Sequence, residues 1–383
     1  MTLPHGVTQT LAVRLPARLT DWQFVLLALL ATRAGLFVVG AVAWQLVPVG
    51  ASFLDVVPGS PWLTMWAQYD AAYYLDIVVR GYSFQPDEFS NAAFFPLYPW
   101  LVRLGWSILG GVSAEALVLV GMIVANVALY VALLYLVALV SRDIGASVAR
   151  RAVLYFLVFP TTVFLSAVYA ESVFLATAIA SVYHARHGEW YRAGIAGGLA
   201  ALSRPFGALL VFPLAIEMLR QRPPRRALPS LFLVPAGLAA FFAYLWWQLG
   251  DPWAYIRANM TWGRGFAWPL DTLIGYAYQP LVVFGWYHSV VDLAFVAGMA
   301  VLAILVWRHL PRSYAAFASI GLLFTTSTAI WISTPRHALA LFPLIVLLAI
   351  YGERTSFNRT WLVVSVALAV VFAGRFFTGY WVA

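Results

Sequence analysis

One acidic side chain in a tyrosine-rich stretch has the clearest potential for chemistry. If the stretch WAQYDAAYYLDIVVR is helical, Asp70, Tyr73 and Tyr74 share a face at spacings i, i+3 and i+4. Asp76 can pair with Arg80 at i+4, whereas Asp70 has no cation at that spacing. A buried carboxylate needs a ligand or a distant arginine, and it could take a proton from a hydroxyl group. The spacing leaves a catalytic base and an ordinary interfacial carboxylate both open.

Four other charged residues stand where apolar runs begin or end, and could act together with Asp70. They are Glu171, Arg204, Arg264 and Arg336. A guanidinium group binds phosphate oxygens in a bidentate manner, so the arginines are candidate phosphate ligands. The alternative is that their stems snorkel along apolar surface or stack on aromatic rings. Glu171 either stabilises a helix N-terminus or faces the same cavity as Asp70.

Aromatic residues close to these charges could bind a sugar ring. Trp262 precedes Arg264 in the glycine-flanked WGRG, where the backbone could approach a ligand closely, and Tyr73 and Tyr74 follow Asp70. His337 follows Arg336 and is a further candidate contact. The six histidines form no HExxH motif and no paired ligand spacing, so we expect no metal site.

Composition identifies the elements that must position these residues. The chain has 383 residues, of which 63% are hydrophobic and 10% charged, and its mean hydropathy is +0.84. Apolar runs of about 20 residues recur, each long enough to cross a bilayer. The sequence therefore predicts an all-α polytopic membrane protein. It contains no cysteine, which excludes disulfides and thiolate metal sites.

The apolar runs predict about eleven transmembrane helices in one membrane domain, 1–383. The expected spans are 22–47, 113–140, 152–167, 171–185, 190–203, 206–219, 228–249, 289–307, 314–332, 338–351 and 359–377. Arginine clusters in short loops place one side in the cytoplasm, with segment 1–21 and the N-terminus inside. The net charge of +8 is thus an orientation signal, and we expect no nucleic-acid partner.

Two long loops are predicted on the extracytoplasmic side. The first, 48–112, carries Asp70 and has amphipathic segments at 62–80 and 94–109 that suit short interfacial helices. The second, 250–288, is rich in tryptophan and tyrosine, and its apolar part, 272–286, could be re-entrant.

Several motifs resemble those of one known family. QYDAAYYLDIVVRGY followed by NAAFFPLYPWLVRL resembles the first luminal loop of the PIG-V family, the GPI mannosyltransferase 2 type, with its bacterial relatives. The resemblance continues in YAESVFL, GGLAALSRPFG, GDPWAYIRANMTWGRG, STPRHALALFPL and YWVA. It implies the GT-C glycosyltransferase fold, with a catalytic acid in the first outer loop. It also implies a lipid-phosphate sugar donor, typically dolichol-phosphate-mannose.

The resemblance gives roles to individual positions. It implies that Asp70 is the base, Glu171 a cavity acid, and Arg204, Arg264 and Arg336 contacts to phosphate or sugar. Where the family has tryptophan before the aspartate, this chain has Tyr69. The absence of lysine and the compact loops resemble bacterial proteins, which favours a bacterial polyprenyl carrier as the donor lipid.

Two functional hypotheses follow. The first is an inverting glycosyltransferase of a bacterial inner membrane, which moves mannose from polyprenyl-phosphate-mannose to a hydroxyl of a glycan or glycolipid acceptor at the outer face. It needs no cofactor besides the lipid-linked donor, and no divalent metal, because the donor has a single phosphate. The second is a lipid-linked sugar flippase or small-solute transporter, which would need polar groups at mid-membrane depth and repeat symmetry. Mid-helix positions here are almost all apolar.

Overall fold

The computed structural model describes residues 19–382 and is helical throughout, with two isolated β-bridges. The elements are α1 Asp21–Leu46, α2 Pro61–Thr64, α3 Ala71–Arg80, η1 Asn91–Ala93, α4 Leu97–Ile108, α5 Ala114–Asp143, α6 Ala146–Leu157, η2 Thr162–Leu165, α7 Glu171–Arg186, α8 Trp190–Ala201, η3 Pro205–Leu210, α9 Val211–Gln221, η4 Arg225–Phe232, α10 Leu233–Leu249, α11 Ala254–Thr261, α12 Pro269–Tyr278, α13 Val290–His309, α14 Arg312–Thr326, α15 Thr334–Ala340, α16 Phe342–Tyr351 and α17 Thr355–Phe377. The prediction of an all-α protein is confirmed for this part of the chain.

The number of transmembrane helices is confirmed only in part. Within residues 19–382, five helical segments are long and apolar enough to cross a membrane: α1, α5, η4 with α10, α13 and α17. The pair α15 and α16 makes a sixth if its 81° bend lies within one span. Helices occupy all eleven predicted ranges, but the others are too short for that criterion, such as α8 with 12 residues. The count of about eleven is therefore not confirmed.

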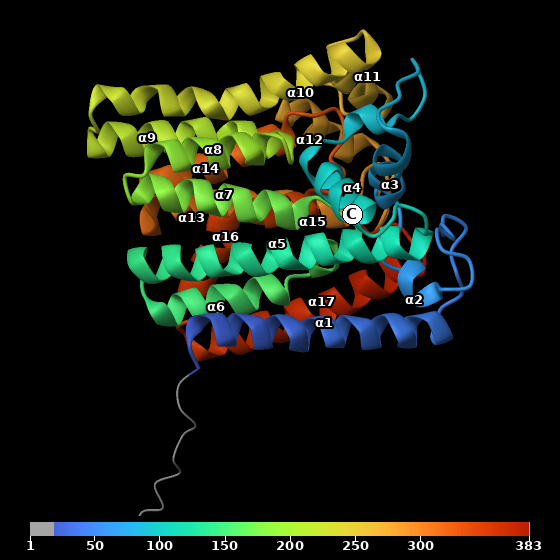
Figure 1. Cartoon of the computed structure of the whole chain (residues 1–383). Coiled ribbons are helices and arrows are strands. Elements are labelled where there is room, and N and C mark those ends of the chain that lie inside the picture. The colour runs from blue at the N-terminus through green and yellow to red at the C-terminus, as the bar shows by residue number, and fades with distance from the viewer. Residues whose placement is uncertain (1–18, 383) are drawn as a thin grey trace, which may run out of the picture.

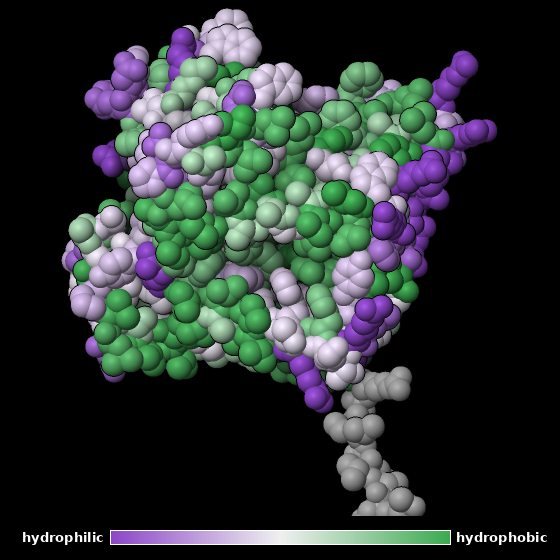
Figure 2. Space-filling view, turned by 180° about the vertical axis from the view of Figure 1, so that it is seen from behind, coloured by the Kyte–Doolittle hydropathy of each residue, from purple (hydrophilic) through white to green (hydrophobic). Residues whose placement is uncertain are grey.

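The long helices lie side by side and run nearly parallel, and the short helices α2, α3, α4 and α11 gather at one end of the bundle (Figure 1). We call this the α3 end, and the opposite end, where residue 19 lies, the α6 end. Apolar side chains cover the flank of the bundle between hydrophilic ends (Figure 2). Such a belt is what a protein surrounded by lipid needs. The first 18 residues of the predicted cytoplasmic segment 1–21 lie outside the described residues.

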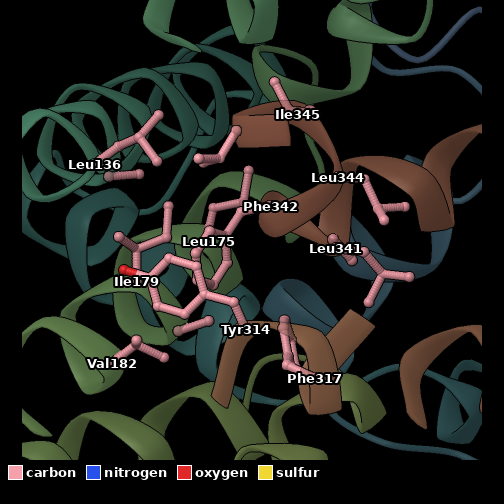
Figure 3. Packing of buried hydrophobic residues seen from close by; sticks show 14 of the residues in the cluster. Leu136, Leu175, Ile179, Val182, Tyr314, Phe317, Leu341, Phe342, Leu344 and Ile345 are labelled. Carbon is pink, nitrogen blue, oxygen red and sulfur yellow. The ribbon is translucent and has the colours of Figure 1, made fainter. Parts of the chain in front are cut away.

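The core is built from α5, α7, α14 and α16, whose aliphatic and aromatic side chains interdigitate. Figure 3 shows Ile179 of α7 close to Tyr314 of α14 and Phe342 of α16. Tyr314 and Phe342 pack edge to face, with ring centroids 5.5 Å apart. A second buried cluster continues this core toward the α3 end, and includes Trp66 and Tyr169. The candidate residues therefore lie on a rigid base.

A buried polar network ties four helices together at the α6 end. Arg186 of α7 donates to Asp143 of α5 at 2.8 Å and to Glu217 of α9 at 3.1 Å. From α14, Tyr314 donates to Asp143 and Ser313 donates to Glu217, both at 2.7 Å. Both carboxylates are 2% exposed and fully hydrogen-bonded, which a buried charge requires.

The predicted amphipathic segment 62–80 is not one helix. It is interrupted between α2 and α3, because the Gln68 side chain hydrogen-bonds to both backbone groups of Leu54 and to the carbonyl of Thr64. Tyr69 then adopts a left-handed backbone with φ 55°. The second predicted segment, 94–109, corresponds to α4. In the second loop the helix α12 ends at Tyr278, so helical structure covers only the first part of the predicted 272–286 segment.

Candidate active site

Asp70 is placed by the break between α2 and α3. It stands at the N-cap of α3, yet its side chain makes no capping hydrogen bond. The left-handed conformation of the preceding Tyr69 costs of order 1–3 kcal/mol. The Tyr69 ring is held against Trp381, with centroids 5.5 Å apart and planes at 88°, and against Phe376. The Asp70 carboxylate, which does not cap its own helix, contacts Arg336 instead.

Asp70, Glu171, Arg204 and Arg336 meet in one buried cluster, which we call the charge cluster. Arg336 Nη1 donates to Asp70 Oδ2 at 2.7 Å. The same guanidinium donates from Nε at 3.0 Å and from Nη2 at 2.8 Å to Glu171 Oε1. The exposed fractions of the side chains are 7% for Arg336, 15% for Asp70 and 2% for Glu171. A distant arginine, one of the two partners that the sequence analysis allowed for a buried Asp70, is thus present, 266 positions along the chain.

Glu171 is the centre of this cluster. Its Oε1 also contacts Nη1 of Arg204 at 2.5 Å, so two arginines share one carboxylate oxygen. Its Oε2 is buried and has no hydrogen-bond partner among the described residues. Glu171 is both the first residue of α7 and a member of the charge cluster. Its position in the first turn of α7 is compatible with the helix N-terminus interpretation, and its contacts bring it beside Asp70, whereas its role in a cavity stays a prediction.

The turn before α7 attaches this cluster to the Asp70 segment. Val168 N–H donates to the Trp66 carbonyl at 3.1 Å, and the Tyr169 hydroxyl donates to the Gln68 carbonyl at 2.9 Å. The Arg336 guanidinium lies 4.9 Å from the centroid of the Tyr169 ring and 4.7 Å from that of another aromatic ring, Phe164. Cation–π contacts of this kind stabilise a desolvated guanidinium. Arg336 is consequently fixed in position on all sides.

Arg264 differs from the other two arginines, because its side chain has no hydrogen bond or ion pair within residues 19–382. Its Nε is buried without a partner. Burial lowers the pKa of this guanidinium, the charge of Asp70 raises it, and the charges of Arg336 and Arg204 lower it again. Arg264 therefore lies in the electrostatic neighbourhood of the charge cluster as a cation without a counterion, which is what a site for an anion needs.

His337 lies beside the cluster on α15. Its ring packs against Phe206, with centroids 5.3 Å apart, and its Nδ1 is buried without a hydrogen-bond partner among the described residues. Like Nε of Arg264, this nitrogen is a buried polar group that is left free for a ligand.

The three predicted aromatic contacts occupy different positions. Tyr73 is half-buried and stacks on Phe94 at 5.0 Å. Burial raises the pKa of Tyr73, and the charge of Asp70 raises it further, so its hydroxyl stays protonated near neutral pH. The edge of Trp262 meets Tyr73 at 5.3 Å, and its face stacks on Trp286 at 5.5 Å. Tyr74 is 5% exposed and lies in the packed wall beneath the site.

Two residues that the sequence analysis did not single out also shape the site. Asp292 of α13 is buried, and its Oδ1 accepts hydrogen bonds from Thr334 N–H at 2.8 Å and Thr334 Oγ1 at 2.9 Å. It therefore holds the first residue of α15, the helix that carries Arg336. The signal was present, because an isolated acid within an apolar run is costly unless it is paired or functional. Trp381 lines the hollow beside Asp70 and Arg336.

An apolar groove touches α15, the helix that carries Arg336. A groove of about 230 Å³ lies between α13, α16 and α17 and reaches Ala338, two residues after Arg336. Its walls are almost entirely apolar, and include Phe295 and Leu344. Among residues 19–382, no three His, Asp or Glu side chains are grouped closely enough to hold a metal ion.

The arrangement of the helices is shared with solved membrane enzymes. ArnT from Cupriavidus metallidurans, solved with undecaprenyl phosphate bound, superimposes with a TM-score of 0.51 over 91% of this chain and 76% of that chain, at 13% sequence identity. The apo structure of the same enzyme gives a TM-score of 0.51 over 91% and 75%, at 14% identity. At this level of identity, the likeness shows a shared arrangement of helices.

Part of the sequence also matches a known family. Residues 53–219 match the family described as Mannosyltransferase (PIG-V), which confirms the resemblance over this part of the chain. GPI alpha-1,6-mannosyltransferase 2 of Mus musculus is 29% identical over 151 residues, or 37% of this chain. The match spans only 29% of the length of the mouse protein. The family match includes Asp70, Glu171 and Arg204, whereas Arg264 and Arg336 lie beyond it.

Proposed function

We propose that this protein is an inverting glycosyltransferase that moves mannose from a polyprenyl-phosphate donor to a hydroxyl group of a glycan or glycolipid acceptor. The observation that carries the proposal is the charge cluster, in which Asp70 is held by Arg336 beside the unpaired Arg264. The PIG-V family match and the GT-C fold support it.

In this proposal Arg264 binds the donor phosphate, with Arg336 next to it. A phosphate monoanion would supply the counterion that Arg264 lacks, and guanidinium groups form bidentate hydrogen bonds with phosphate oxygens. The same positive charge stabilises the phosphate that leaves during transfer. Arg204 and Glu171 fix the position of Arg336, because Glu171 Oε1 accepts hydrogen bonds from two of its nitrogens. His337 would offer its free Nδ1 to the sugar or the phosphate.

Asp70 is proposed as the general base. Its Oδ2 is held by Arg336, and its Oδ1 has no partner among the described residues, so this oxygen is available to an acceptor hydroxyl. In a single displacement, the acceptor oxygen forms a bond to the anomeric carbon of mannose. The bond between that carbon and the phosphate oxygen breaks, and the phosphate leaves with the electron pair. The hydroxyl proton passes to Asp70. A positioned base contributes about 10²–10⁴-fold to such a rate.

The aromatic residues and the apolar groove complete the donor site in this proposal. Tyr73 and Trp262 are in edge contact and would border the sugar, whereas Tyr74 is buried and packs on Phe94, on which Tyr73 stacks. The groove between α13, α16 and α17 would take the first isoprene units, because its walls are apolar and it reaches Ala338 on the helix that carries Arg336. Lipid-soluble donors require such an entrance from the bilayer, since their tails do not enter water.

We also propose that the α3 end faces outward from a bacterial inner membrane, with the N-terminus in the cytoplasm. The supporting observation is the distribution of arginines. The run LRQRPPRRA and residues Arg142, Arg150 and Arg151 lie at the α6 end, and such clusters mark cytoplasmic loops.

The decisive experiment compares Asp70→Asn with Asp76→Asn. Both residues belong to the same segment, but Asp76 pairs with the exposed Arg80, as the sequence predicted. Purified variants are incubated with polyprenyl-phosphate-mannose and candidate acceptors, and the product is identified by mass spectrometry. We expect Asp70→Asn to lose about 10²–10⁴-fold in rate while it still binds donor, and Asp76→Asn to keep near-normal turnover. Near-normal transfer by Asp70→Asn refutes the assigned base.

A further inference from the structure

A second apolar groove lies apart from the charge cluster, on the flank formed by α1 and α17. These two helices are side by side at the edge of the bundle (Figure 1). The groove has a volume of about 520 Å³ and is lined by valines such as Val42 and Val371, which are 48% and 49% exposed. Both helices are long and apolar enough to cross a membrane, so this groove opens to hydrocarbon.

One charged residue, Arg375, lines this groove, and it lies near the α3 end of α17. Its guanidinium is fixed by the protein. Nε and Nη2 donate to the Trp381 carbonyl at 3.1 and 2.9 Å, and the group lies 4.1 Å from the centroid of the Phe284 ring. Nη1 donates to no group within residues 19–382. An oriented cation with a free donor therefore stands at the end of an apolar groove.

This combination fits an amphiphile with a hydrocarbon chain and a single negative charge. Hydrocarbon fills apolar walls, and an anionic headgroup accepts a charge-assisted hydrogen bond from the free guanidinium nitrogen. Arginine near a membrane surface attracts anionic lipid in this way. The phosphodiester of a membrane phospholipid such as phosphatidylglycerol carries one charge, which matches the one guanidinium group of the groove.

The groove is separate from the proposed donor site. The hollow beside Asp70 and Arg336 is lined by Trp381 but not by Arg375, which binds only the backbone carbonyl of Trp381. The other groove, which reaches Ala338, lies elsewhere, between α13, α16 and α17, and Arg375 does not line it. A headgroup bound at Arg375 is therefore not positioned for transfer.

We propose that the groove between α1 and α17 binds an anionic membrane phospholipid, with Arg375 as the headgroup ligand. This inference does not depend on the transfer reaction. Two variants separate the contributions of headgroup and chain. Arg375→Gln removes the charge. Gly374→Leu fills the groove, because a Cβ at Gly374 meets only the Cβ of Ala43, at 3.7 Å. Arg103→Gln removes an exposed arginine of α4 at the same end of the bundle and is the matched control.

The test is native mass spectrometry of the detergent-solubilised full chain, titrated with phosphatidylglycerol or with phosphatidylcholine of the same acyl chains. We expect one phosphatidylglycerol to bind about five- to tenfold more tightly than phosphatidylcholine. Arg375→Gln should remove this preference, Gly374→Leu should weaken the binding of both lipids, and Arg103→Gln should behave as the unmodified chain.

Three outcomes would overturn the proposal. The first is equal binding of the two lipids to the unmodified chain, and the second is an unchanged preference in Arg375→Gln. If that variant unfolds, full retention of phosphatidylglycerol by a folded Gly374→Leu variant counts equally against the site. The third is displacement of phosphatidylglycerol by equimolar undecaprenyl phosphate, which would assign the groove to a polyprenyl chain. Retention of phosphatidylglycerol in that competition supports the proposal.

Discussion

Replacing Arg264 by glutamine should separate ligand binding from stability. The side chain of Arg264 has no hydrogen bond or ion pair among residues 19–382, so its removal breaks no polar contact within that part of the chain. A buried guanidinium without a counterion carries a desolvation penalty, which the neutral amide largely avoids. We therefore expect the free energy of unfolding of Arg264→Gln to stay the same or to rise by about 1 kcal/mol.

The loss should appear in donor binding. A hydrogen bond between charged partners contributes about 1.5–3 kcal/mol, which corresponds to about 10–150-fold in affinity. The assay measures initial rates against the concentration of polyprenyl-phosphate-mannose at saturating acceptor, together with the midpoint of thermal unfolding. We expect the KM for donor to rise by that factor, with little change in the KM for acceptor.

The neighbouring Arg257 provides the matched control. It lies on α11, is exposed, and pairs with Asp251, so Arg257→Gln removes an arginine seven positions away that does not face the charge cluster. This variant should leave the KM for donor unchanged. If Arg264→Gln lowers the unfolding midpoint by more than about 5 °C and leaves donor binding intact, Arg264 is a structural cation and the phosphate assignment is wrong.

Three further predictions address the support, orientation and stability of the site. Asp292→Ala removes the acceptor for Thr334 N–H and should lower turnover about tenfold. Asp292→Asn keeps an acceptor oxygen and should have near-normal turnover. Equal losses of turnover in the two variants would contradict this positioning role. The chain has no cysteine, so a single introduced cysteine reports the side of the membrane on which it lies. The cysteine of Glu88→Cys should react with an impermeant maleimide added outside intact cells, and that of Arg225→Cys should react only after lysis. The opposite result would reverse the proposed topology. Tyr314→Phe should cost about 1.5–3 kcal/mol of stability without altering the KM for donor; unchanged thermal unfolding would show that its hydrogen bond to Asp143 contributes little.

Local patterns in the sequence were sufficient to predict the helices. Runs of apolar residues marked α1, α5, α13 and α17, because lipid-facing helices need apolar side chains on every side. The pairing of Asp76 with Arg80 followed from their spacing and is confirmed. These features depend on residues that are close along the chain.

The geometry of the site depended on contacts between distant residues. The break before α3 arises because the side chain of Gln68 binds the backbone of Leu54, and no periodicity reports such a contact. Arg336 and Glu171 were both identified as candidates, but nothing in the sequence indicated that they pair with each other, 165 positions apart. Sequence patterns also made Arg204, Arg264 and Arg336 equal candidates for binding phosphate. Only the structure shows that Arg264 is unpaired, whereas the other two contact Glu171.

The network at the α6 end has a practical consequence for work on this protein. Arg186, Asp143 and Glu217 are satisfied by one another and by their neighbours, so four helices are joined there without any ligand. Engineering for crystallography or detergent tolerance can therefore concentrate on that region, where added stability should not slow turnover. Stabilising changes near Arg264 would instead be expected to compete with substrate.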